Sequence, residues 1–249
     1  MIYGLRNHRS TDAVRVIRRV LPRSIHPDHP NAVGTVMHAT LKRFTEHQKR
    51  AEKTFAEHTI TQRLDEGLFR SWRCQKPKTW CYGFDVHTTP GSLIVTGDIG
   101  LMVFEREADM LAWLRGSIND PYYMAGKVPQ SIKTREYCHE VAKEVIRDCG
   151  RGVKPDNFPS IYTSSTGRMD YKQVKERFKE MLGSQSDLDV HDEHSVKSTL
   201  YESGFFDGGD FPSLDDFTGT FLWIHSALKW FVANLPANPQ PAHEEAYHA

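Results

Sequence analysis

Four short runs rich in β-branched and aromatic residues, within residues 68–107, limit the possible folds more than any other feature of the sequence. They are LFRSWRC at 68–74, TWCYGFDVHTT at 79–89, SLIVTGD at 92–98 and LMVFERE at 101–107. The segments QKPK, PG and GDIG punctuate them, and proline and glycine are typical of tight turns. The pattern predicts four consecutive antiparallel strands joined by short connections.

Polar and apolar residues alternate within the second run. Trp80, Tyr82, Phe84 and Val86 alternate with Cys81, Gly83, Asp85 and His87. Because neighbouring side chains of a strand point to opposite faces, one face can pack against other elements while the other carries polar groups. The following READMLAWLRGSI carries apolar residues at helical spacing and predicts a covering helix. We therefore expect an α+β fold: an antiparallel four-stranded meander covered by helices, with helical N- and C-terminal regions.

The chain divides into three stretches. Residues 1–66 form a basic helical region with a long helix expected over 31–64, and residues 67–127 form the meander-plus-helix core. Residues 128–249 form an acidic helical region, with helices expected over 131–149 and 170–183. The three stretches are expected to pack as one compact unit. Residues 1–63 carry 12 Lys and Arg against 5 Asp and Glu, whereas residues 185–249 carry 2 against 11.

Composition excludes several classes of protein. The 39% hydrophobic content of 249 residues is enough for a globular core. No apolar run approaches the roughly 20 residues of a membrane helix, so we expect no membrane association and a location in the cytoplasm of the host cell. The four cysteines lack the spacing of a zinc site, and we expect free thiols without a metal or other cofactor.

The GDIG segment at 97–100 has two interpretations. As structure, its glycines supply the positive φ that a hairpin turn requires, and Asp98 bonds to the backbone of its own turn. As a catalytic site, Asp85, His87 and Asp98 match part of the DxH and GDxxD motifs of calcineurin-like metallophosphoesterases. Leu101 stands where the second motif needs an acid, and no GNH motif follows. The structural interpretation is favoured, and these three residues remain the weak catalytic candidates.

Aromatic and acidic residues interleave in the segment GFFDGGDFPSLDDF at 204–217. Either the aromatic side chains complete the core, with the aspartates capping turns and the final helix, or some stay exposed as a docking surface. We favour an exposed patch that contacts a basic host protein. Its residues are Phe205, Phe206, Asp207, Asp210, Phe211, Asp215 and Asp216.

The region 55–123 resembles a family of uncharacterised proteins encoded by tailed bacteriophages and prophages. The shared pattern covers about a quarter of the chain. Its residues here are His58, Asp65 to Arg70, Pro77, Tyr82 to Asp85, Pro90 to Leu93, Gly97 to Gly100, Phe104 to Arg106 and Asp109 to Trp113. Members usually have Trp before the Pro-Gly pair, where this chain has Thr89. The resemblance implies a phage origin and a shared module, without an activity.

These observations favour a binding protein over an enzyme. We expect a phage accessory protein that binds a host protein or a protein–nucleic acid complex, with inhibition of a host defence system as the suggested role. The alternative is an enzyme that acts on a nucleotide or nucleic acid near Asp85, His87 and Asp98. Weak, non-specific nucleic-acid binding through basic residues of the first stretch is also expected. They are Arg15, Arg18, Arg19, Arg23, Lys42, Arg43, Lys49 and Arg50.

Overall fold

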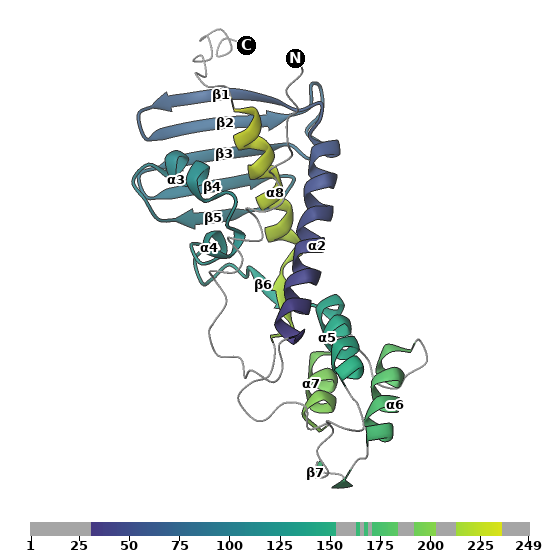
Figure 1. The fold of residues 1–249 in the computed structure, drawn as a ribbon. Helices are drawn as coiled ribbons and strands as arrows, with labels where there is room; N and C mark the ends of the chain where they lie inside the picture. The colour runs from purple at the N-terminus through teal and green to yellow at the C-terminus, as the bar shows by residue number, and fades with distance from the viewer. Residues whose placement is uncertain are drawn as a thin grey trace, which may run out of the picture. The chain divides into compact units, whose positions relative to one another are not determined.

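The computed structural model describes residues 31–152, 163–164, 167–168, 171–183, 192–202 and 213–235 (Figure 1). Its described residues form two compact units. Among the described residues, the first unit holds 44–134 and 218–235, and the second holds 31–43 and the described parts of 135–217. The boundaries of these units do not follow the three stretches of the sequence, since each unit combines segments from distant parts of the chain.

A five-stranded antiparallel sheet forms the centre of the first unit. Its strands follow the order of the chain, and each pairs with the next. The predicted α+β class is confirmed, but the predicted number of four strands is wrong. The strands are β1 Thr59–Glu66, β2 Phe69–Gln75, β3 Phe84–Thr89, β4 Ser92–Gly97 and β5 Met102–Glu105.

The additional strand, β1, lies where the sequence predicted the end of a long helix. Helix α2, Asn31–Thr54, ends ten residues before the predicted Leu64. A turn at 55–57 follows, in which the His58 amide donates to the Phe55 carbonyl. The next residues, Thr59, Ile60 and Thr61, are all β-branched, and β-branched residues favour an extended backbone. Pairing with β2 then stabilises this strand.

Helices cover one face of the sheet, which we call the covered face. Helix α8, Gly219–Asn234, and helix α3, Met110–Ser117, lie on it (Figure 1). Trp72 of β2 packs edge-to-face on Phe231 at a centroid distance of 5.4 Å, and Phe104 of β5 packs on Trp113 at 5.9 Å. Asp109 caps α3 by accepting hydrogen bonds from the amides of Leu111 and Ala112. The short helix α4, Pro121–Ala125, follows α3.

The second predicted run of strand residues is only half a strand. β3 begins at Phe84, and a loop occupies residues 76–83. Lys78 and Tyr82 have positive φ, so the chain turns there instead of extending. The predicted alternation therefore holds for Phe84 and Val86, which are fully buried, and fails for Trp80 and Tyr82, which are exposed.

Helices form most of the described part of the second unit. Its hydrophobic cluster joins Val141, Val145 and Ile146 of α5, His139–Gly152, to Phe178 and Met181 of α6, Tyr171–Leu182. Val196 and Leu200 of α7, Glu193–Glu202, complete it. Two small antiparallel pairs accompany these helices: β6 Arg135–Tyr137 with β9 Asp215–Phe217, and β7 Thr163–Ser164 with β8 Gly167–Arg168.

The helix predicted over 131–149 starts later than expected. Residues 135–137 form β6 and bond to β9, a partner from a distant part of the chain. The helix then begins at His139 and continues past Gly150 to Gly152. By contrast, the helix predicted over 170–183 matches α6 closely. Among the described helices, none is both long and apolar enough to cross a membrane.

Candidate functional site

The face of the five-stranded sheet opposite α3 and α8 forms the candidate site, and we call it the uncovered face. Cross-strand pairing places its side chains in two rows. Both are exposed or half-buried, and no described helix of the first unit lies over them (Figure 1). One row is Leu64, Ser71, His87, Ile94 and Val103; the other is Thr61, Arg73, Asp85 and Thr96.

Arg73 and Asp85 form the most ordered polar group on this face. Arg73 donates from Nε and Nη2 to the two carboxylate oxygens of Asp85, each at 2.8 Å. The same guanidinium stacks on the exposed ring of Trp80 at 4.8 Å. Burial by itself raises the pKa of Asp85, but the hydrogen bonds and charge of Arg73 outweigh it and lower the pKa. Asp85 is therefore a charged acceptor that fixes Arg73, and a poor proton acceptor for catalysis.

His87 makes a different contact in the neighbouring row. Its Nδ1 lies 3.0 Å from Ser71 Oγ, a hydrogen bond across the β2–β3 pair. Hydroxyl and imidazole groups at this distance can act as nucleophile and general base. The sequence pattern does not indicate this pair, because Ser71 and His87 are neighbours only through the register of two strands.

Asp98 does not join Asp85 and His87. Its Oδ2 accepts a hydrogen bond from the Tyr82 amide at 2.7 Å, and its own amide donates to the Gly83 carbonyl. Gly97 and Gly100 both have positive φ, as the turn interpretation of GDIG predicted. The predicted local bond within the turn is wrong, because Asp98 instead holds the 76–83 loop against the β4 end. Within the described ranges, no three His, Cys, Asp or Glu side chains form a set able to hold a metal ion.

The acidic aromatic patch predicted in the third stretch falls mostly outside the described residues. Phe205, Phe206, Asp207, Asp210 and Phe211 all lie there.

The last two residues of that patch, Asp215 and Asp216, are described and belong to β9. Asp215 is half-buried, while Asp216 is 0% exposed. Asp216 accepts hydrogen bonds from Thr40 Oγ1 at 3.0 Å and from Arg43 Nη1 at 2.6 Å. The prediction that Asp216 is exposed is therefore wrong: a buried carboxylate needs charged and hydrogen-bonding partners, and α2 supplies both.

The same cluster engages a cysteine. Arg43 Nη1 also donates to Cys138 Sγ at 3.3 Å, at the start of α5. Burial raises the pKa of the Cys138 thiol to about 11 despite Arg43, so it stays protonated at neutral pH. Cys74, Cys81 and Cys138 are free thiols, as predicted.

The basic residues of the first stretch divide into two groups. Arg15, Arg18, Arg19 and Arg23 lie outside the described residues. In α2, Arg43 pairs with Asp216, and the Arg50 guanidinium stacks on Trp223 at 5.0 Å. These two cations are thus engaged within the protein, which weakens the expectation that α2 binds nucleic acid.

Comparison with known proteins finds no match for the chain among protein-family models, curated proteins or solved structures.

Proposed function

We propose that this protein is a phage accessory protein that acts by binding a host macromolecule, and that the uncovered face is its binding surface. The observation that carries the proposal is a sheet face with apolar, aromatic and charged groups, over which no described helix of the first unit lies. The resemblance of residues 55–123 to proteins of tailed bacteriophages supports the phage origin. Inhibition of a host defence system, in the cytoplasm of the host cell, is the proposed role.

The composition of the uncovered face favours a protein partner. Leu64, Ile94 and Val103 are its apolar side chains, in the same row as the polar Ser71 and His87, and Trp80 beside Arg73 gives it an ordered aromatic and cationic group. Tryptophan and arginine dominate the binding energy of protein interfaces, especially where they are held in place before binding. Because Asp85 already fixes Arg73, little side-chain entropy is lost when a partner docks on this pair.

A positive charge introduced at the centre of the face tests the proposal. Ile94→Lys places an ammonium group beside the apolar side chains of the uncovered face, whereas Ala112→Lys places the same charge on the exposed side of α3. The tagged wild-type chain is used to capture partners from infected host cells, as are both variants. The captured protein is then purified, and its affinity for each of the three chains is measured by titration. We expect Ala112→Lys to bind as wild type and Ile94→Lys to bind at least tenfold more weakly.

Two outcomes separate a binding defect from misfolding. Thermal unfolding of Ile94→Lys shows whether the variant is folded at the temperature of the capture experiment. A folded Ile94→Lys that binds the purified partner with wild-type affinity contradicts the proposal, and moves the binding surface to the region 203–212. Substitution of the aromatic residues there is then the next experiment.

The alternative function is an enzyme that acts on a nucleotide or nucleic acid, and the Ser71–His87 hydrogen bond favours it. In this role His87 takes the proton of Ser71 as the hydroxyl oxygen bonds to phosphorus and the bond from phosphorus to the leaving oxygen breaks; His87 passes the proton to that oxygen, and water then releases the phosphoryl group from Ser71. Hydrolysis of nucleotides and of single-stranded and duplex DNA is measured for wild type, Ser71→Ala and Thr96→Ala. Turnover by wild type and Thr96→Ala that is lost in Ser71→Ala supports the enzyme, and equal turnover by all three chains contradicts it.

A further inference from the structure

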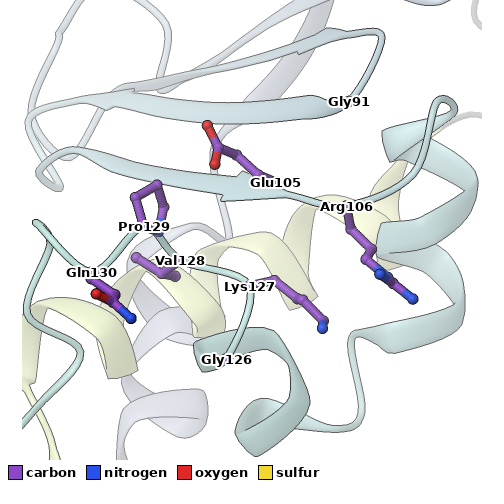
Figure 2. Close-up of a pocket in the computed structure, with 8 residues that line it drawn as sticks. All are labelled: Gly91, Glu105, Arg106, Gly126, Lys127, Val128, Pro129 and Gln130. Carbon is purple, nitrogen blue, oxygen red and sulfur yellow. The ribbon is translucent and has the colours of Figure 1, made fainter.

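A shallow pocket of about 460 Å³ lies at the β5 edge of the first unit (Figure 2). Glu105 and Arg106 line it from the end of β5, and residues 126–130, which follow α4, line the other side. Hydrogen bonds fix the backbone here: the Glu105 amide donates to the Lys127 carbonyl, and the Arg106 amide donates to the Gly91 carbonyl. The pocket is therefore built on paired backbone from three segments of the chain.

Two cations extend from this pocket toward the same side. Figure 2 shows the side chains of Arg106 and Lys127 pointing toward α3 and α4, while the Glu105 carboxylate points away from both. Lys127 Nζ lies 4.9 Å from the centroid of the Tyr123 ring. Glu107 pairs with the Nε atom of Arg106 at 3.2 Å, in an exposed contact. The positive groups thus converge around Tyr123.

Tyr123 joins these cations to a buried donor, the indole N–H of Trp113. Trp113 is only 7% exposed, and the Tyr123 hydroxyl is the acceptor nearest its indole Nε1 among the described residues. Its ring lies 6.3 Å from that of Tyr123. The nearby indole N–H, together with Arg106 and Lys127, lowers the pKa of the Tyr123 hydroxyl. A buried donor needs an acceptor, and the Tyr123 oxygen supplies one here, so changes at Tyr123 are felt by the indole N–H.

We propose that Arg106, Lys127 and Tyr123 bind the phosphate group of a small molecule. The phosphate accepts hydrogen bonds from the guanidinium, the ammonium and the phenol O–H. Once the phenol donates to an anion, its oxygen becomes a stronger acceptor for the Trp113 indole N–H. A phosphate dianion also balances two cations, which a carboxylate does not. Binding here is independent of the role proposed for the uncovered face.

Nuclear magnetic resonance of the tryptophan indoles tests this site. Inorganic phosphate is titrated into the full chain at constant ionic strength, and the Trp113 indole N–H signal is assigned with Trp113→Phe. We expect a saturable downfield shift of this signal. Loss of one charge-assisted hydrogen bond in Arg106→Gln or Lys127→Gln raises the Kd about tenfold. Tyr123→Phe removes the downfield shift.

Matched variants separate a specific site from general charge. Arg115→Gln removes the same charge from an exposed position of α3 and leaves the Kd unchanged, whereas Glu105→Gln leaves it unchanged or lowers it. A parallel titration with adenosine 5′-monophosphate distinguishes the sources of the phosphate, since tighter binding identifies a phosphate monoester and equal binding identifies free phosphate. Absence of a saturable shift with either probe, or an equal loss of affinity in Arg115→Gln, overturns the proposal.

Discussion

The two faces of the five-stranded sheet belong to the same strands but differ in the contacts that their side chains make. On the covered face, Trp72, Phe84, Val86, Leu93 and Phe104 are fully buried beneath helices. On the uncovered face, side chains contact one another across strands through the Arg73–Asp85 and Ser71–His87 pairs. We therefore expect the covered face to provide most of the stability of the unit, while the side chains of the uncovered face are exposed or half-buried.

Truncation of one large side chain on each face is expected to give the largest difference. Trp72→Ala removes a fully buried indole that packs on Phe231, and such substitutions cost about 3–5 kcal/mol of unfolding free energy. Ile94→Ala on the uncovered face is expected to cost about 1 kcal/mol, because its side chain is already half in water. Chemical denaturation measures both. Equal losses would mean that another segment covers Ile94.

Acid is expected to act through the helix that packs on the covered face. His225 of α8 donates from Nε2 to the Ile118 carbonyl, and burial lowers its pKa from 6.5 to about 4. Between these values the unfolded chain binds more protons than the folded chain, so stability falls as pH decreases from about 6.5 to 4. The loss amounts to roughly 3 kcal/mol.

Two substitutions isolate this contribution. His225→Gln keeps an amide donor for Ile118 and cannot titrate, so the free energy of unfolding should depend less steeply on pH than in wild type. Ile94→Ala, on the uncovered face, changes no titratable group and should retain the wild-type slope. Denaturation midpoints between pH 4 and 7 measure how stability depends on pH. If His225→Gln has the same dependence as wild type, the acid sensitivity belongs to other groups.

The glycines in the turns at the two ends of β4 are expected to differ in how much stability is lost when each is substituted. Gly97 and Gly91 both have positive φ, but a Cβ at Gly97 would lie 2.5 Å from the Gly83 carbonyl oxygen, whereas a Cβ at Gly91 has open space. Gly91→Ala is expected to cost about 1 kcal/mol from backbone strain alone. Gly97→Ala adds a clash with backbone and is expected to cost at least about 2 kcal/mol. If the two melting temperatures fall equally, the close approach at Gly97 is wrong.

Asp98→Ala is expected to have the smallest effect. It removes the hydrogen bond to the Tyr82 amide, a loss of about 1 kcal/mol. Asp98→Asn retains an acceptor oxygen and should recover most of this loss in thermal unfolding. A variant of wild-type stability that nevertheless loses partner binding would give Asp98 a functional role instead of the structural one.

The alternation of residues made one part of the fold predictable. Phe84 and Val86 were correctly assigned to the packed face, and Asp85 and His87 to the other, because strand geometry fixes this from sequence alone. The positive φ of Gly97 and Gly100 followed equally from the turn pattern. Such local rules fail for Trp80, since a loop at 76–83 interrupts the run.

Long-range partners account for the remaining differences. β1 and β6 are polar strands that the sequence pattern does not identify; β1 pairs with the predicted β2, and β6 pairs with β9 from a distant part of the chain. Asp216 resembled a solvated acid because its partners, Thr40 and Arg43, lie more than 170 residues away in the chain. The Ser71–His87 pair likewise depends on strand register. These contacts are tertiary, so composition and periodicity carry little information about them.

Solvent accessibility of the two faces in the full chain is the most direct measurement. A soluble paramagnetic agent broadens the methyl signals of side chains that meet solvent, and the full-length chain can be labelled at isoleucine, leucine and valine methyls. We expect strong broadening for Ile94 and Val103, weak broadening for Val86 and Leu93, and loss of broadening at Ile94 when the captured partner is added. Equal protection of Ile94 and Val86 in the chain alone would contradict the existence of an uncovered face.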